Sequence, residues 1–326
     1  MRAGVGILLF MLALAGAAKE PPHDERVIDL KALGYPQPPC DYMFPEDGFG
    51  KNSIEFLDSE KLLVSFPADT IGCDKKHPYF PSKFRSVIID FSGKILRSFD
   101  WQHGQDIQAG PDGHILFTTG KEIRILDSDF SLLQSIPDPR PELQRIGVTV
   151  DPARHGFVLN HGYPAYHVVY FSGTPARKTL EADHCTVISV EGGFVCWEST
   201  HPPRFAVHVE PNAPPADLRD RDAVISPGLN ENPDKKWAAP GWPASLGHQG
   251  RSISTSGRIM YFCTGTLFPL TDSGGLGNFL RVIVVDTSQE RTILRKQYHV
   301  SSDVALSPDG NWFAVREGTR LTLRRL

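Results

Sequence analysis

The sequence has few cysteines, no long apolar segment after its first residues and no cluster of basic residues. Its 326 residues include five cysteines, and its longest basic runs are pairs such as Lys75-Lys76. With 34 Lys and Arg against 38 Asp and Glu, the formal net charge is −4. Nucleic-acid binding needs clustered cations to neutralise phosphates, so no nucleic-acid partner is predicted. No segment beyond the first residues approaches the length that crosses a bilayer, so no membrane span is predicted.

Motifs that specify chemistry are also missing. The sequence has no CxxC pair and no Cys/His spacing typical of a structural zinc site. It has no HExxH, phosphate-binding loop, nucleophile elbow or calcium-loop motif. No cofactor is therefore predicted, and no metal is assigned.

The first eighteen residues, MRAGVGILLFMLALAGAA, are typical of a secretory signal peptide. One Arg precedes an apolar run from Val5 to Leu14, and Ala15-Gly16-Ala17 supplies the small residues of a cleavage site. The alternative, a membrane anchor, is disfavoured because this run is too short to span a bilayer. We expect residues 1–18 to be removed and residues 19–326 to form one domain, exported to the periplasm or the cell exterior.

In an oxidising compartment, five cysteines predict two disulfides and one free thiol. Cys40 precedes the first strand group described below, and Cys73 lies in a long loop of that group. We expect a Cys40–Cys73 bond there. Cys185 and Cys196 fall on paired strands of a later group and are the second expected pair. Cys263 is then left as a buried free thiol.

The rest of the chain consists of short apolar runs separated by Gly, Pro, Asp and Ser, which is typical of β-strands. The runs recur in groups that open with a strand, a tight turn and a second strand. A third strand follows that often ends in Asp, as at Asp90 and Asp286, and then a fourth strand. The turns of the opening hairpins, spaced 37 to 64 residues apart, are marked by Glu60, Gly113, Gly156, Gly193, Gly257 and Gly310.

Four-stranded units of this length predict an all-β fold, a β-propeller. Six blades of about 51 residues fit residues 19–326. A seventh blade within the irregular, Pro-rich insertion 210–250 is the alternative. The last group, residues 303–326, holds only three strands. We therefore expect residues 27–30 to supply its outer strand and close the ring, which would hide two sheet edges.

The last group also carries a recognisable motif. Its Ser307-Pro308-Asp309-Gly310 turn, followed by Phe313-Ala314-Val315, resembles the WD40-like and YVTN-like repeats of exported bacterial β-propellers of uncharacterised function. The resemblance is good over the last 25 residues and partial in the second and fifth blades. It implies a propeller architecture and no particular chemistry.

One face of the expected propeller carries most of the irregular sequence. In a four-stranded blade, the loop before the first strand and the loop between the second and third strands lie on the same face. The second-to-third-strand loops are long here, as at 67–83 and 265–278. We call this side the loop-rich face. Binding sites usually lie on loops that a rigid scaffold holds, so this is the predicted working face.

Histidines recur just before the expected innermost strands. Four of them lie 9 to 11 residues before a turn glycine, and Arg145 takes this place in the third blade. Imidazoles and carboxylates that converge at the channel mouth would bind a divalent metal or perform acid–base chemistry. The other interpretation is structural, because propeller channels are normally lined by polar residues. The candidate ligand-binding residues at the channel mouth are His103, Asp106, Arg145, His184, His248, Arg251, His299 and Asp303.

The sequence favours one function over another. The favoured hypothesis is a non-catalytic module that binds a protein or an envelope component through the loop-rich face. The alternative is a small-molecule lyase or hydrolase with a His-lined site at the mouth of the central channel. The two hypotheses differ in geometry, because an enzyme needs at least two of these imidazoles near one point.

Overall fold

The computed structural model describes most of the chain, and the description that follows concerns these residues alone. They are almost entirely β-strand, with two short 3-10 helices at Leu30–Leu33 and Pro111–Gly113. Among them, no helix is long and apolar enough to cross a membrane. The described residues are 24–35, 54–68, 83–143, 145–151, 154–161, 167–183, 185–187, 194–200, 203–208, 246–267, 277–286, 288–289, 291–299 and 302–326.

The described strands form antiparallel sheets in which strands adjacent in sequence are neighbours in space. The first sheet contains β2 (Ile54–Phe56), β3 (Lys61–Pro67), β4 (Lys83–Asp90) and β5 (Ile95–Gln102). The second contains β6 (Asp106–Ala109), β7 (Ile115–Thr118), β8 (Glu122–Leu126) and β9 (Leu132–Pro137). The third contains β10 (Arg145–Val150), β11 (Gly156–His161), β12 (His167–Ser172) and β13 (Arg177–Asp183).

The remaining strands form three further sheets. The fourth has three described strands, β14 (Cys185–Val187), β15 (Phe194–Thr200) and β16 (Pro203–His208). The fifth contains β17 (Leu246–Ile253), β18 (Arg258–Leu267), β19 (Gly277–Asp286) and β20 (Arg291–His299). The sixth has the order β1 (Glu25–Asp29), β23 (Arg320–Arg325), β22 (Trp312–Glu317) and β21 (Asp303–Leu306).

The sixth sheet joins the two ends of the described chain. Strand β1 runs antiparallel to β23, with Ile28 opposite Leu321, so the N-terminal segment supplies the outer strand as the sequence predicts. The strand ends at Asp29, whose carboxylate accepts a hydrogen bond from the backbone N–H of Lys31 at 3.0 Å and starts a helical turn. Leu30 then leaves the sheet and is fully buried in the core.

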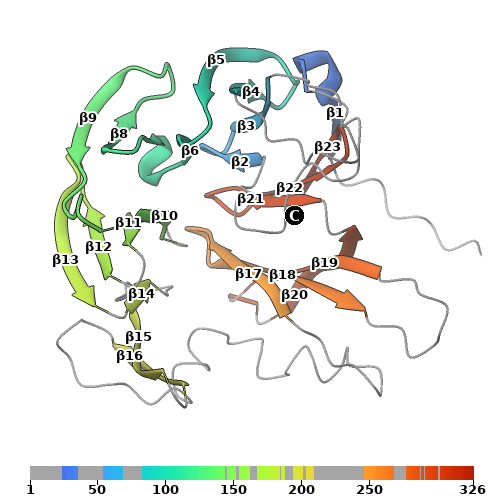
Figure 1. Cartoon of the computed structure of the whole chain (residues 1–326). Coiled ribbons are helices and arrows are strands. Elements are labelled where there is room, and N and C mark those ends of the chain that lie inside the picture. The colour runs from blue at the N-terminus through green and yellow to red at the C-terminus, as the bar shows by residue number, and fades with distance from the viewer. Residues whose placement is uncertain are drawn as a thin grey trace, which may run out of the picture.

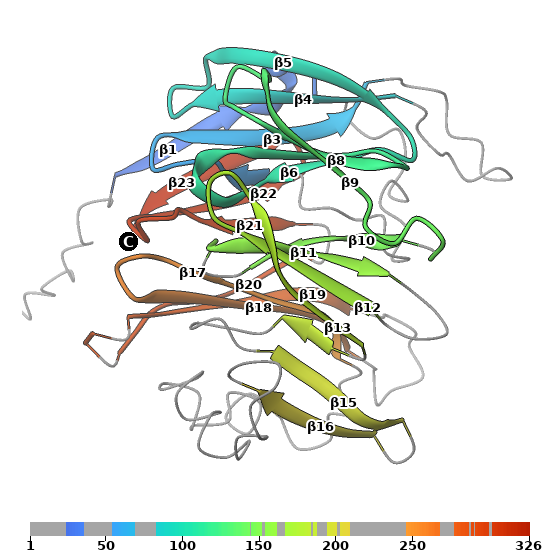
Figure 2. The same ribbon diagram turned by 90° about the vertical axis from the view of Figure 1, so that its left-hand side faces the viewer.

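The sheets are arranged around a common centre (Figure 1). The first strands β2, β6 and β10 lie toward the middle of the view, and the fourth strands β5, β9 and β13 lie on the periphery. Strand β2 contacts both β6 and β21, and β17 contacts β21. The second and third sheets face the viewer in Figure 2. Four-stranded sheets with innermost first strands are the architecture of a β-propeller.

The hydrophobic core lies between neighbouring sheets. Between the first and second sheets, Leu63 and Ile88 pack with Ile107 and Phe117. Similar clusters join the second sheet to the third, the fifth to the sixth, and the sixth to the first. The first, second and sixth sheets each take part in two of these clusters and are therefore buried on both faces. Their middle strands show little alternation of buried and exposed residues, and all four residues of Ile115–Thr118 are buried.

Aspartates at the ends of third strands cap the turns that follow. Asp90 Oδ1 accepts hydrogen bonds from the backbone N–H of Ser92 at 2.8 Å and of Lys94 at 3.1 Å. Asp127 and Asp286 accept backbone N–H groups of their own turns in the same way. A carboxylate that takes turn N–H groups stabilises the turn locally. The recurring strand-Asp pattern of the sequence therefore marks the third-to-fourth-strand turns.

The Ser-Pro-Asp-Gly turn between β21 and β22 also contacts the neighbouring sheet. Ser307 Oγ accepts a hydrogen bond from the backbone N–H of Trp312 at 2.9 Å and closes the turn. Gly310 adopts a φ of 73°, a left-handed conformation that favours glycine. A Cβ atom at Gly310 would overlap the side chain of Ser254 in the turn between β17 and β18. The motif therefore serves packing between the fifth and sixth sheets.

This close approach predicts different costs for two glycine substitutions. Gly318 also has a positive φ, 60°, but no atom lies within 4 Å of a Cβ built there. We expect Gly318→Ala to lower the free energy of unfolding by about 1 kcal/mol through backbone strain alone. Gly310→Ala adds the steric overlap and should cost about 2–4 kcal/mol. Denaturant unfolding of both variants checks this, and equal losses would show that the contact with Ser254 is unimportant.

The capped turns also predict acid sensitivity. Hydrogen bonds from Ser92 and from Ser288 lower the pKa values of Asp90 and Asp286 below the ordinary 3.8. A carboxylate with a lowered folded-state pKa stabilises the fold above its unfolded pKa, and this contribution is lost as the pH falls through the folded-state value. Stability should therefore decline below about pH 4. Unfolding of Asp286→Asn between pH 2 and 7 should have a shallower acid slope than the wild type, and parallel curves would contradict this.

Candidate functional site

The predicted channel-mouth residues whose side chains the structure describes, His103, Asp106, His299 and Asp303, lie at different places on the loop-rich face. Asp106 and Asp303 are the first residues of the inner strands β6 and β21, as expected. His103 lies in the turn that follows β5, and its side chain is exposed. His299 is the last residue of β20, the outer strand of the fifth sheet, and is also exposed. These two imidazoles therefore lie on connections between an outer strand and the next inner strand.

The other predicted residues are described only in part. Arg145 is the first residue of β10, and His248 and Arg251 lie within β17, where the backbone alone is described. The pairing of β17 with β18 shifts register between Leu246 and Gln249, at the position of His248. His184, Cys40, Cys73 and most of the insertion 210–250 fall outside the described residues. Within the part of the chain that the structure describes, no three His, Cys, Asp or Glu residues form a metal-binding group.

Asp303 has a structural partner. Its carboxylate accepts hydrogen bonds from Arg316 Nε at 2.7 Å and ion-pairs with Arg316 Nη2 at 2.6 Å. The Arg316 side chain is 4% exposed, and its guanidinium lies 5.7 Å from the centre of the Tyr35 ring. Burial alone would lower the pKa of Arg316, but the negative charge of Asp303 raises it above the ordinary value. Asp303 therefore neutralises a buried cation.

A second group of polar side chains, which the sequence analysis does not single out, lies on the loop-rich face of the third sheet. His161 ends β11, and its Nε2 lies 2.8 Å from Asp138 Oδ1. His167 begins β12, and its Nε2 lies 2.9 Å from Glu181 Oε1. The two histidines are opposite each other in the β11–β12 register, with ring centres 5.9 Å apart. We call these four residues, with Arg140 and Lys178, the paired-histidine cluster. Lys178 is the second residue of β13, near the β12–β13 turn, and it joins the cluster through its ammonium group, which reaches Glu181.

Charged side chains surround Glu181 in this cluster. Lys178 Nζ donates to Glu181 Oε2 at 2.7 Å, and Arg140 Nη1 lies 3.4 Å from Glu181 Oε1. The Lys178 hydrogen bond lowers the pKa of Glu181, burial opposes this, and Arg140 and His167 lower it further. Glu181 is therefore ionised at neutral pH. The side chains of Arg140 and Lys178 are 36% and 51% exposed, so both cations are accessible from solvent.

The buried half of the cluster holds a connection in place. His161 is fully buried, and Asp138 belongs to the segment that leads from β9 to β10. Their contact fastens this segment to the third sheet. The backbone N–H of Arg140 also donates to Asp138 Oδ1 at 3.0 Å, which fixes the chain next to the exposed guanidinium. Among the described residues, His161 Nδ1 has no hydrogen-bond partner, although it is buried. Because His161 has no exposed surface, the cluster presents its charges through Arg140, Lys178 and Glu181.

The sequence contains a signal for this histidine pair. His161 and His167 flank the five-residue segment 162–166, which lies between the second and third strands of the third sheet. In an antiparallel hairpin, residues placed symmetrically about the loop are opposite each other. The six-residue spacing therefore predicts adjacent imidazoles. Their partners Asp138 and Glu181 have no such signal, because they come from two other segments.

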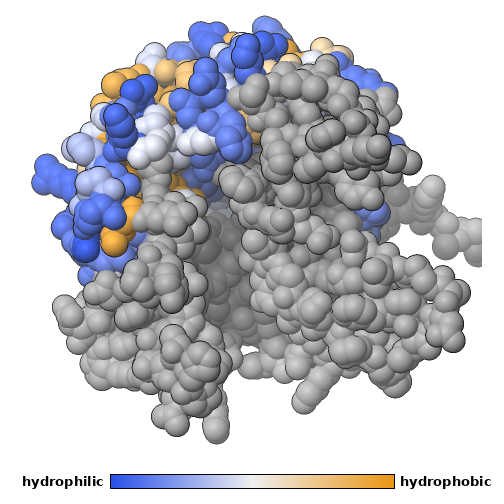
Figure 3. Space-filling view, viewed as in Figure 1, coloured by the Kyte–Doolittle hydropathy of each residue, from blue (hydrophilic) through white to orange (hydrophobic). Residues whose placement is uncertain are grey.

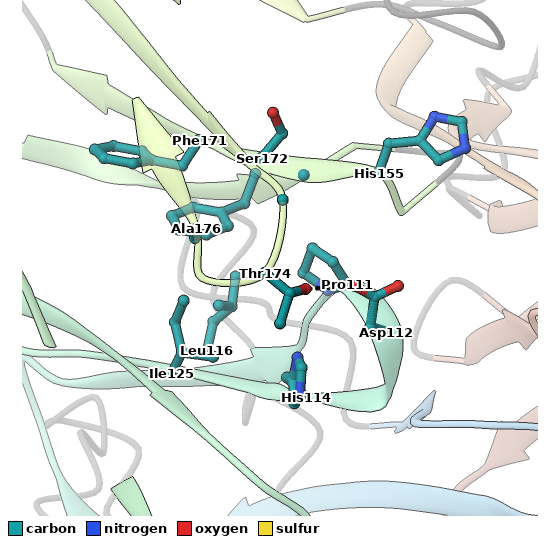
Figure 4. Close-up of a pocket in the computed structure, with 13 residues that line it drawn as sticks. Pro111, Asp112, His114, Leu116, Ile125, His155, Phe171, Ser172, Thr174 and Ala176 are labelled. Atoms are coloured by element: carbon teal, nitrogen blue, oxygen red, sulfur yellow. Dashed lines mark hydrogen bonds between the residues drawn. The ribbon is translucent and has the colours of Figure 1, made fainter. Parts of the chain in front are cut away.

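An open hollow lies on the opposite face, between the second and third sheets (Figure 4). It is lined by Pro111, His114, Leu116, Phe157 and Phe171, among others. Thr174 Oγ1 donates to Asp112 Oδ2 at 3.2 Å and links the two sheets at its edge. His114 and His155 lie on different sides of the hollow. Nothing in this arrangement brings the two imidazoles to a common ligand.

The described surface is mostly hydrophilic in the view of Figure 3, with scattered hydrophobic residues. Among the described residues, the exposed large hydrophobic side chains all belong to outer strands, namely Val27 of β1, Ile95 of β5, and Leu132 and Leu133 of β9. Single exposed apolar residues are ordinary on a protein surface.

Comparisons with known proteins concern the fold alone. No protein-family model matches the chain, and no curated protein matches it. Among solved structures, the Pan2 WD40 domain of Neurospora crassa is 8% identical, with a TM-score of 0.40 over 86% of this chain and 90% of that one. A DUF4221 family member from Bacteroides vulgatus is 8% identical, with a TM-score of 0.41 over 94% and 96%. Hsv2 of Kluyveromyces lactis is 15% identical, with a TM-score of 0.35 over 81% and 71%.

The buried contact predicts an energetic coupling between His161 and Asp138. His161→Leu removes one partner of a pair in which both side chains are nearly inaccessible to water, and should cost about 2–4 kcal/mol of unfolding free energy. Combined with Asp138→Asn, the loss should be smaller than the sum of the single losses by about 1–2 kcal/mol. Denaturant unfolding of the single and double variants measures this coupling.

The neighbouring pair is the matched control. Glu181 is one-third exposed, so the coupling between His167→Leu and Glu181→Gln should be about 0.5 kcal/mol or less. Additive losses at His161 and Asp138 would mean that their contact does not hold the connection in place.

Proposed function

We propose that the chain is an exported, six-bladed β-propeller that binds a protein or an envelope component through its loop-rich face. The pairing of β1 with β23 supports a ring closed by the N-terminal strand. The contacts that β2 makes with β6 and β21 support first strands that line a shared centre. The apolar run and small-residue site within residues 1–18 support export.

The observation that carries the binding function is the paired-histidine cluster. Its buried pair, His161 and Asp138, fixes a connection between two rigid sheets. Its exposed part offers Arg140, Lys178 and Glu181 in positions that their mutual hydrogen bonds restrict. Charged groups that are already ordered lose less conformational freedom on association than free side chains do. Charges of both signs also favour a partner with complementary charge, such as a folded polar protein surface.

The catalytic alternative needs imidazoles that converge near one point. His103 and His299 lie on separate connections and are exposed, and His161 is inaccessible to solvent. Asp303, a predicted acid–base group, is engaged by Arg316. Binding is therefore the function that the described geometry supports better.

Charge reversal on the two faces tests this proposal. The full mature chain, residues 19–326, is cross-linked to the cells' own secreted and envelope proteins. Arg140→Glu combined with Lys178→Glu should lower the yield of the specific cross-linked product about tenfold, because it places like charges against the partner. Lys94→Glu is the control, because Lys94 is exposed in the β4–β5 turn on the opposite face.

The outcome is read together with thermal melting of each variant. Binding would be assigned to another surface if both variants retain the product. The same conclusion would follow if Lys94→Glu loses the product and the Arg140→Glu, Lys178→Glu variant keeps it. Loss in the folded Arg140/Lys178 variant alone supports the loop-rich face.

A further inference from the structure

Two cysteines are directly opposite each other in the fourth sheet. In the β14–β15 pair, Cys185 is the register partner of Cys196. Directly opposed residues of an antiparallel pair have Cα atoms about 4.5–5.5 Å apart. A disulfide requires Cα atoms about 4.4–6.8 Å apart, and the spacing typical of directly opposed residues falls within this range.

The other described cysteine has no such neighbour. Cys263 lies in β18, where its register partners are Gln249 of β17 and Arg281 of β19. Among the strands that the structure describes, Cys185 and Cys196 are thus the one pair of cysteines in register.

We propose that Cys185 and Cys196 form a cross-strand disulfide that makes the β14–β15 pairing sensitive to redox conditions. Strand β14 has only three residues, all paired to β15. It also contacts β11 and β12 of the third sheet. A strand this short is held by few backbone hydrogen bonds, so a covalent link to β15 would strongly affect its opening. The inference goes beyond the proposed binding function and does not depend on it.

The bond forms by thiol–disulfide exchange with a small disulfide oxidant, such as glutathione disulfide. The thiolate of one cysteine attacks the oxidant, forms a mixed disulfide and releases one glutathione thiolate. The second cysteine thiolate then attacks the protein sulfur of the mixed disulfide and releases the second glutathione. The two cysteines lose two protons and two electrons, and the oxidant gains the two electrons as two thiolates.

Peptide mapping of the full mature chain tests the link. The protein is equilibrated in a glutathione buffer, its free thiols are alkylated, and it is digested with trypsin and a glutamyl endopeptidase. Trypsin releases residues 179–204 as one peptide with both cysteines, and cleavage after Glu191 separates Cys185 from Cys196. The two halves should remain linked until reduction, in the wild type and in the Cys263→Ser control. Cys185→Ser should leave Cys196 open to alkylation. An oxidised wild-type chain in which Cys196 is alkylated, or linked elsewhere, overturns the proposal.

A second measurement asks whether the fold itself promotes the bond. The equilibrium constant for oxidation by glutathione is measured in buffer and in concentrated guanidinium chloride. If the register holds the cysteines together, the native constant should exceed the denatured one by roughly tenfold or more. Equal constants would show that the β14–β15 pairing does not bring the cysteines together, and would overturn the inference even where the mapped link is present.

Discussion

The structure depends on one constraint, which is that its first, second and sixth sheets are buried on both faces. A strand whose residues are all buried, as in Ile115–Thr118, needs a packed neighbour sheet on each side. The clusters meet this need, because each of them joins two neighbouring sheets around the common centre. The sixth sheet meets the same constraint with residues from both ends of the described chain, because Ile28 and Leu30 pack in one cluster with Leu321 and Leu323.

Burial on both faces also decides where polar residues are found. Most side chains of the middle strands are committed to packing, so polar groups concentrate where the strands end. On one side of the molecule they stabilise turns, as Asp90 and Ser307 do. On the loop-rich face they instead join a strand end to another segment, as Asp138 of the β9–β10 connection with His161 of β11, and Asp303 of β21 with Arg316, its register partner on β22. The Asp138–His161 contact holds the β9–β10 connection in place, and the Asp303–Arg316 ion pair joins two strands of one sheet.

The sequence predicts the strand groups well because their determinants are local. Asp90 and Asp286 act on turns of a few residues, and Gly310 is required by the backbone of its own turn, so each is readable from neighbouring residues. The candidate site is a different case. Asp303, a predicted channel-mouth residue, forms an ion pair with Arg316, its register partner across the β21–β22 hairpin, and the guanidinium of Arg316 also lies near Tyr35, which is far away in sequence. The spacing of His161 and His167 about a hairpin loop signals that pair, but their partners Asp138 and Glu181 come from other segments, so only the packing identifies them.

The paired-histidine cluster connects the packing of the sheets to the surface of the loop-rich face. Asp138 accepts from both the buried His161 and the backbone of Arg140, so the position of the exposed guanidinium depends on a contact inside the protein. A change that weakens the packing of the third sheet against the β9–β10 connection also releases Arg140 from its ordered position and weakens its ion pair with Glu181. By linkage, a partner that binds the ordered arrangement stabilises the buried contact by the same free energy. In the proposed binding mode, recognition at this face and the packing between the second and third sheets would therefore be energetically coupled.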